Sequence, residues 1–326
     1  MKHKLYKAEI HVHLEAALPP SLCKKFAKRN NLKISDEIFG NEYAYAWEDF
    51  YDFLKKYDVV TSVINTPEDY YELTYNYLKE CAKDDVIYVE AMVSSTHAKL
   101  KGMTYKSFLE GVTEAAKKAE EEFGIISRYI MNGIRHLGPD SVYKTAKEVL
   151  DNPHPYLVGF GLAGDELHYP PNLFVNTFDM IKKENFPITV HAGEWDGPKN
   201  IRQAIKLLHP KRLGHGVRSI EDPELVKEII DLDIVLETCP TSNIATKIYP
   251  SYEEHPVKEL FNQGVKITVN SDDPPFFNAT IAGEYKAMSE LGFSNDQLLS
   301  LTKNAIQYSF CDNEIKNKLL NKLKLK

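Results

Sequence analysis

Ala8-Glu9-Ile10-His11-Val12-His13-Leu14 is the first of eight short apolar segments along a chain of 326 residues, and each has the length of a buried β-strand. Longer segments with helical periodicity separate them. Parallel strands need crossover connections of this kind, and eight such units close into a (β/α)₈ barrel. A doubly wound open sheet is the alternative. The predicted strands cover Ala8–Leu14, Val86–Val93, Ile125–Gly133, Leu157–Leu162, Ile188–His191, Arg212–His215, Ile234–Glu237 and Lys266–Asn270.

The segments between these strands carry helix signals. Thr66-Pro67-Glu68-Asp69 combines an N-cap, a proline in the first turn and an acid at the third position, and Ser294-Asn295-Asp296-Gln297 is a similar capping box. Tyr105–Phe123 has the period of an amphipathic helix. Leu32–Ala82 is long for one crossover, so we expect a helical insertion after the first strand, and extra helices at the C-terminal end. Nothing divides the chain, so residues 1–326 are expected to form one domain.

Composition narrows the classes of protein. The formal net charge is −7, and the one basic cluster, Lys316–Lys326, is interpreted as the polar face of a C-terminal helix, so we expect no nucleic-acid partner. No apolar run approaches the ~20 residues of a membrane span, and Met1–Lys7 lacks the apolar stretch of a secretory signal. We therefore expect a cytoplasmic protein without a membrane partner. The four cysteines form no Cys-x-x-Cys motif and are expected to be reduced and buried: Cys23, Cys81, Cys239 and Cys311.

Histidines and acids cluster where strands end. The alternation of side chains along a strand points His11 and His13 to the same face. A His-x-His pair alone is more often a pair of ordinary strand side chains than a pair of metal ligands. His191 ends the fifth strand, and Asp272 follows the eighth. A barrel brings the C-terminal ends of its strands together in its active site. Three imidazoles and a carboxylate suit one zinc ion and leave a coordination position for water, as in a catalytic site.

Three further residues suggest acid–base chemistry. Glu194 lies just beyond the strand that ends in His191, which favours proton transfer over the alternative of a solvated loop acid. His215 lies between two glycines and is expected to orient the attacking hydroxide, with a buried structural histidine as the alternative. Adjacent carboxylates repel each other, so Asp273 beside Asp272 is expected to act on the attacking water, with a solvated turn as the alternative.

The motifs together resemble the adenosine deaminase family of the amidohydrolase superfamily, over nearly the whole chain. They are, in order, His-x-His at 11–13, Leu-Ala-Gly-Asp-Glu at 162–166, Val-His-Ala-Gly-Glu at 190–194, Gly-His-Gly at 214–216, Cys-Pro-Thr-Ser-Asn at 239–243 and Asn-Ser-Asp-Asp-Pro at 270–274. Ile134–Pro139 and Pro274-Pro275 are similar to a bacterial branch of the family.

The resemblance implies a zinc-dependent hydrolase of a cyclic amidine C–N bond, acting on a small purine in purine salvage. Glu194 would protonate ring nitrogen N1 during attack at C6, and His215 and Asp273 would position and deprotonate the water. The backbone N–H of Gly164 would bind N3. The implied zinc ligands are His11, His13, His191 and Asp272, and the implied substrate contacts are His13, Glu15, Gly164 and Asp273.

One motif leaves the substrate open. The adenosine enzymes usually have Leu-Asp-Gly after the second histidine, where the aspartate holds a ribose hydroxyl, whereas this chain has Leu14-Glu15-Ala16. Adenine deaminases, which are close relatives, have glutamate at that place. Leu236–Asn243 is more similar to the nucleoside enzymes, so we expect adenosine and deoxyadenosine, giving inosine and ammonia. Adenine or another 6-aminopurine is the alternative, followed by a different metal-dependent barrel hydrolase and a non-catalytic purine-binding protein.

Two features stay without a fixed role. Trp47, Phe50 and Leu54 share one helical face, which is interpreted either as core or as the apolar lid of a purine pocket. His136 lies in the motif of the bacterial branch but suggests no chemistry. The histidines outside every motif are assigned no role: His3, His97, His154, His209 and His255.

Overall fold

The eight predicted strands form a parallel barrel in sequence order. The computed structural model describes residues 5–324, in which strands β1 to β8 pair consecutively in one sheet. Asp272 closes the barrel, because its N–H donates to the carbonyl of His11 at 3.2 Å and its carbonyl accepts from the N–H of His13 at 2.9 Å. The (β/α)₈ prediction is confirmed. The strands are β1 (Lys7–His13), β2 (Val86–Val93), β3 (Ile126–Ile134), β4 (Leu157–Ala163), β5 (Ile188–Ala192), β6 (Arg212–His215), β7 (Val235–Thr238) and β8 (Ile267–Val269).

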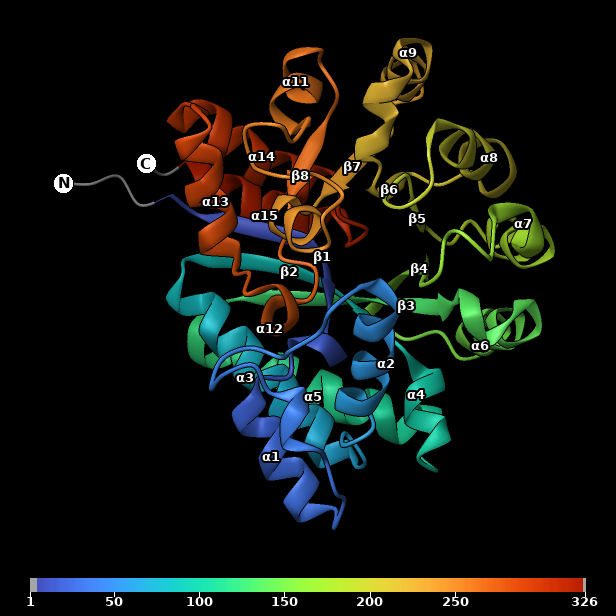
Figure 1. Ribbon diagram of the computed structural model, residues 1–326, viewed down its shortest axis with the longest axis vertical. Coiled ribbons are helices and arrows are strands. Elements are labelled where there is room, and N and C mark those ends of the chain that lie inside the picture. The colour runs from blue at the N-terminus through green and yellow to red at the C-terminus, as the bar shows by residue number, and fades with distance from the viewer. Residues whose placement is uncertain (1–4, 325–326) are drawn as a thin grey trace.

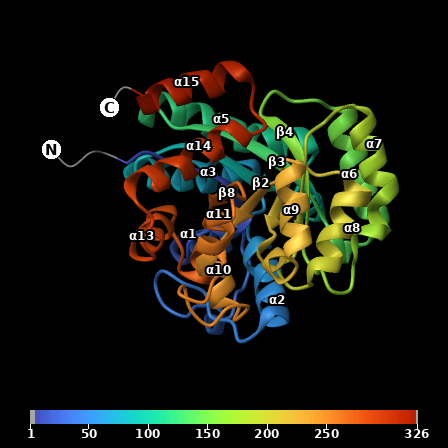
Figure 2. The same ribbon diagram turned by 90° about the horizontal axis from the view of Figure 1, so that it is seen from above.

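Helices surround this barrel. In Figure 1, α6, α7, α8 and α9 follow one another along one side, and Figure 2 shows α3, α5, α14 and α15 gathered on another. The helices are α1 (Pro20–Arg29), α2 (Phe50–Thr61), α3 (Pro67–Lys83), α4 (Ser95–Leu100), α5 (Tyr105–Phe123), α6 (Pro139–Asp151), α7 (Val175–Lys183), α8 (Pro198–Leu208), α9 (Pro223–Asp231), α10 (Pro240–Ala245), α11 (Val257–Asn262), α12 (Pro274–Phe277), α13 (Ile281–Glu290), α14 (Asn295–Tyr308) and α15 (Asn313–Lys324).

The local helix signals act as expected. The side chains of Thr66 and Ser294 cap α3 and α14, and each helix returns a side chain to the backbone of its cap residue. Helix α5 has the predicted bounds. The predicted insertion, 32–82, holds α2 and most of α3, whereas α1 precedes it. The basic C-terminal cluster lies on α15 up to Lys324, and its last two residues lie outside the described part of the chain.

The interior contains apolar side chains and a row of three buried charged residues. Arg212 of β6 is fully buried between two carboxylates, Glu90 of β2 at 2.7 Å and Glu237 of β7 at 2.5 Å. The four cysteines are free and buried, as predicted. Within residues 5–324 no helix combines the length and apolar character that a membrane crossing requires.

Candidate active site

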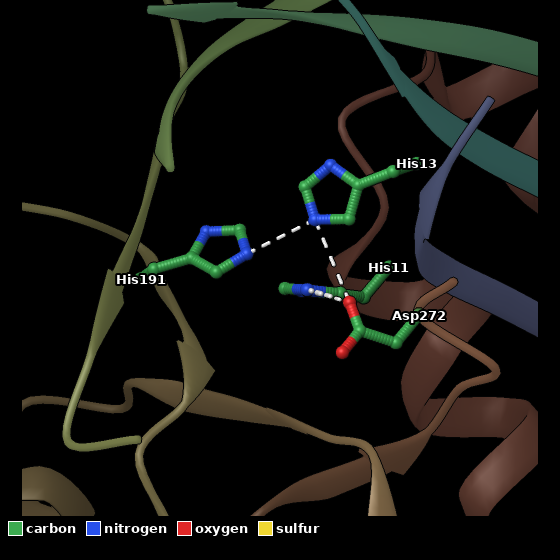
Figure 3. Close-up of side chains that lie close together, drawn as sticks. All are labelled: His11, His13, His191 and Asp272. Carbon is green, nitrogen blue, oxygen red and sulfur yellow. Dashed lines mark hydrogen bonds and ion pairs between the residues drawn. The ribbon is translucent and has the colours of Figure 1, made fainter. Parts of the chain in front are cut away.

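Four side chains from three strand ends converge at the carboxyl end of the barrel. His11 and His13 come from β1, His191 comes from β5, and Asp272 follows β8. Figure 3 shows these side chains pointing toward one another. The Nε2 atoms of His13 and His191 are 3.2 Å apart, and Asp272 Oδ1 lies 3.4 Å from His11 Nε2 and 3.5 Å from His13 Nε2. Their ligand atoms all lie within 4.8 Å of one another, which fits a single metal ion.

Unpaired buried atoms support this fit. His11 Nε2 and Asp272 Oδ1 lie 3.4 Å apart, but both are buried without a hydrogen bond, although buried polar atoms are normally hydrogen-bonded. A second set of close ligand atoms consists of His11, His215, Cys239 and Asp272. Burial holds the pKa of the Cys239 thiol well above its usual range, and its Sγ lies 3.6 Å from the Glu237 carbonyl, an acceptor for a protonated thiol. Because the thiolate is the form that binds metal, the set of three histidines and Asp272 fits better.

The three candidate histidine ligands differ in their pKa values and therefore in their protonation states. Burial lowers the pKa of His13 to about 4, and burial together with neighbouring histidines holds the pKa of His191 well below its usual range. Burial opposes protonation of His11, but Asp272 and Glu237 raise its pKa to about 9. A metal ion would therefore meet two neutral imidazoles and displace one proton from His11.

Of the acids Glu194, Asp273 and Asp272, the first two favour their protonated forms. Burial, then Asp272 and Glu166, raise the pKa of Glu194 well above its usual range. Burial and the charge of Asp272 do the same for Asp273. The histidines hold the pKa of Asp272 itself well below its usual range, against the effect of burial. The site thus contains an ionised ligand carboxylate beside acids that can donate a proton.

His215 lies between the acid and the ligand carboxylate. Its Nε2 is 3.6 Å from Glu194 Oε2 and 3.9 Å from Asp272 Oδ2. Both His215 and Asp272 have positive φ angles, 60° and 61°, which residues other than glycine rarely adopt. Strained backbone of this kind is found preferentially at functional sites, where the surrounding structure holds it.

A cavity of about 650 Å³, including space open to solvent, adjoins these residues. Its lining includes the candidate ligands His13, His191 and Asp272, the candidate acid–base residues Glu194, His215 and Asp273, and Gly164. The structure therefore brings together nearly all the residues that the sequence predicts.

Helix α2 covers this cavity. Phe50 and Leu54 line it, and the ring of Phe50 lies 4.3 Å from that of Trp195, next to Glu194. Trp47 instead packs behind the wall, where its Nε1 donates to the carbonyl of Phe276 at 2.8 Å. The apolar face of 47–54 thus contributes to both the cavity lining and the core.

Glu15 is the predicted site residue that lies elsewhere. It is 1% exposed and does not line the cavity. Its Oε1 accepts from the backbone N–H of Ser94 at 2.8 Å and from the Tyr70 hydroxyl at 3.3 Å. The carboxylate therefore holds the loop after β2 rather than facing the predicted ligands.

Comparison with known proteins agrees with this geometry. The model of the adenosine deaminase family matches residues 6–326. The chain belongs to the adenosine deaminase family. It is 41% identical to an adenine deaminase of Rhizobium meliloti (strain 1021) over 321 residues, which cover 98% of each chain. It is also 41% identical to an adenine deaminase of Rhizobium leguminosarum bv. trifolii (strain WSM2304) over 320 residues, which cover 98% of this chain and 99% of that one. The crystal structure of an adenine deaminase from Arthrobacter aurescens superposes with a TM-score of 0.90 at 27% identity, covering 98% of each chain.

Membership of the adenosine deaminase family makes this protein a hydrolase of cyclic amidine C–N bonds. The expectation that its substrate is adenosine is wrong, because relatives at about 40% identity over the whole chain are named adenine deaminase. That expectation relied on Leu236–Asn243. In the structure, Glu237 contacts the candidate ligand His11, and Cys239 is fully buried. Neither residue therefore indicates whether the substrate carries a sugar.

Three supporting residues of this family member escaped the sequence analysis. Glu237 accepts from His11 Nδ1 at 2.7 Å, and both side chains are fully buried. Glu166 accepts from four consecutive backbone N–H groups, 193–196, at 2.6 to 3.4 Å and so holds the loop of Glu194. Arg135 is fully buried and donates to the carbonyl of His191 at 2.5 Å. All three lie in motifs that the sequence shows, at 134–139, 162–166 and 236–243, and a charged residue within a buried strand is a second signal for Glu237.

Proposed function

We propose that this chain is a zinc-dependent adenine deaminase, which converts adenine and water into hypoxanthine and ammonia in purine salvage. The observation that carries the proposal is that relatives named adenine deaminase match the whole chain at about 40% identity. The complete set of candidate ligands and acids at one end of the barrel supports catalysis over simple binding.

The proposed metal ligands are His11, His13, His191 and Asp272. Imidazole and carboxylate ligands suit zinc, and four protein ligands on one ion leave a place for water. Zinc bound there would supply hydroxide at neutral pH by lowering the pKa of its water to about 7.

The remaining residues handle the base and its protons. Glu194, whose raised pKa keeps it protonated, gives a proton to N1 as the hydroxide oxygen bonds to C6. A zinc ion bound to Asp272 would counter the charge that raises the pKa of Asp273 and would so favour its ionised form. His215 and Asp273 then hold the attacking water and take its proton, and His13 borders the reacting atoms. The backbone N–H of Gly164 donates to N3. The C6–N bond then breaks, and the amino group leaves with an added proton as ammonia.

The test is substrate profiling by ultraviolet absorbance. The purified enzyme is stripped with a chelator, reloaded with one equivalent of zinc, and given adenine, adenosine and deoxyadenosine in parallel. We expect kcat/KM to be greatest for adenine, and the stripped enzyme to be inactive until zinc is restored. Failure of the zinc-loaded enzyme to deaminate adenine, or faster turnover of adenosine, would refute the proposal.

A further inference from the structure

Three polar side chains that the proposed reaction does not use line one side of the cavity. They are Asp58 at the end of α2, His97 in α4, and His136 in the turn after β3. His97 and His136 follow β2 and β3, whereas the proposed ligands and acids follow β1, β5, β6 and β8. The cavity therefore offers a second polar surface on the β2–β4 side of the barrel.

One ring nitrogen of each histidine lacks a hydrogen-bond partner within the described chain. The Nδ1 atoms of His97 and His136 are both buried without a hydrogen bond, and the one close ionic contact is that of His97 Nε2 with Asp58 Oδ1, at 3.8 Å. Burial, with a smaller effect of His136, lowers the pKa of His97 to about 4, so its ring is neutral. Buried ring nitrogens that face a cavity and have no protein partner are suited to a polar ligand.

Gly164 fixes the place of His136 relative to the substrate. Gly164 has a φ of 99°, and a Cβ built on it would lie 2.9 Å from His136 Nδ1. The residue must be glycine because its backbone is left-handed and because the imidazole leaves no room for a side chain. The imidazole of His136 thus lies directly against the backbone that, in the proposed reaction, binds N3.

We infer that His136 accepts a hydrogen bond from the N9–H of adenine and thereby selects the free base over its nucleosides. This inference rests on the proposed adenine deaminase activity. Glu194 at N1 and Gly164 at N3 orient the purine, and N9 is separated from N3 by a single ring carbon. A group beside Gly164 on the cavity wall therefore faces the N3–N9 edge. The Nδ1 atom of His136, which is buried without a hydrogen bond, is the acceptor.

The chemistry of N9 explains the selection. In adenine N9 carries a proton, and in adenosine it carries the sugar instead. A nucleoside would leave the acceptor of His136 unpaired in a buried place and would bring the sugar against the imidazole. A site built to bind a hydrogen-bonding group rejects an analogue that lacks it, because the buried polar atom of the site is then left unsatisfied.

The experiment compares adenine with 9-methyladenine, in which a methyl group replaces the N9 proton, in zinc-loaded enzyme. We expect the wild-type enzyme to favour adenine, and His136→Ala to lower kcat/KM for adenine about 5- to 150-fold, the factor that corresponds to an unsatisfied buried group. The ratio of kcat/KM for 9-methyladenine to that for adenine should rise in His136→Ala. His136→Gln, which keeps an acceptor oxygen, should recover part of the adenine activity.

The matched control is His209→Asn, at an exposed histidine with a φ of 53°, a conformation that asparagine tolerates. It should leave both substrates unchanged. A loss of folded protein lowers both rates equally and does not move their ratio. Equal use of the two bases by the wild-type enzyme, or an unchanged ratio in His136→Ala, would overturn the role of His136. Absence of adenine turnover by the wild-type enzyme would instead refute the proposed function.

Discussion

Replacement of Glu237 by glutamine tests how the barrel interior prepares the metal site. The two carboxylate oxygens of Glu237 have different partners. Oε1 lies 2.5 Å from Arg212 Nε and accepts from Thr189 Oγ1 at 3.0 Å, and Oε2 accepts from His11 Nδ1 at 2.7 Å. A glutamine keeps the volume of the side chain but retains only one of the two oxygens. The positive charge of Arg212 attracts that oxygen, so the new amide NH₂ faces His11.

The expected consequence is a change of tautomer in His11. The amide NH₂ requires Nδ1 to accept, which places the ring proton on Nε2, the atom that faces Asp272 and the other proposed ligands. Metal at Nε2 forces the remaining ring proton onto Nδ1, where the wild-type carboxylate accepts it but the amide NH₂ of the variant opposes it. Mutation of such a partner of a metal-ligating histidine typically costs 10- to 100-fold in affinity, or about 1.4–2.7 kcal/mol. We expect Glu237→Gln to weaken zinc binding by this factor, as measured by competition with a fluorescent zinc chelator.

Glu90→Gln is the matched control. Glu90 is an equally buried carboxylate on the other side of Arg212, at 2.7 Å, and no described hydrogen bond joins it to His11. Breaking a buried ion pair typically costs about 3–5 kcal/mol of stability, so both variants should unfold at lower denaturant concentration. Zinc affinity should fall in Glu237→Gln alone. Wild-type zinc affinity in Glu237→Gln, or equal weakening in Glu90→Gln, would refute the proposed control of the His11 tautomer.

Three other substitutions test separate parts of the site. Glu194→Gln removes the proposed proton donor and should lower kcat about 10²- to 10⁴-fold with the zinc content of the protein unchanged; near wild-type turnover would contradict that role. Glu166→Gln directs an amide at the backbone N–H groups of 193–196 and should lower kcat without altering zinc affinity; equal loss of zinc would show that it acts through the ligands instead. Burial raises the pKa of Glu284 from 4.5 to about 8, so the folded chain holds an extra proton between these values and its free energy of unfolding should fall as pH rises through this window. Glu284→Gln should flatten that slope in denaturation curves recorded from pH 5 to 8, and a slope equal to that of the wild type would refute this assignment.

The barrel and the candidate metal ligands could be predicted because both depend on local pattern. Strand alternation puts His11 and His13 on one face without knowledge of any other element. The rule that active sites lie at the carboxyl ends of barrel strands then brings His191 to the same place. Asp272 follows a strand of only three residues, and its bridge to β1 is what closes the barrel.

The substrate could not be predicted in the same way. Glu15 lies two residues beyond His13, but the chain enters a 3₁₀ turn at Glu15–Ala17, so strand alternation no longer fixes where its side chain points. The carboxylate is instead held by Ser94 and Tyr70, which are distant in sequence. Glu166 escaped prediction for a related reason, because its function lies in contacts with the backbone of another loop.

In the proposed mechanism, chemistry and recognition come from different parts of this fold. The proposed reacting groups lie on or directly after strands, where a rigid sheet sets their mutual distances. The side of the cavity that we assign to substrate selection comes from α2 and from the segments after β2, β3 and β4. The role that we propose for His136 depends on its contact with Gly164, whose backbone is left-handed. The sequence around His136 does not indicate that contact. The motifs that surround the candidate metal ligands can thus indicate the reaction, whereas the proposed selection of base over nucleoside depends on contacts that only the folded chain brings together.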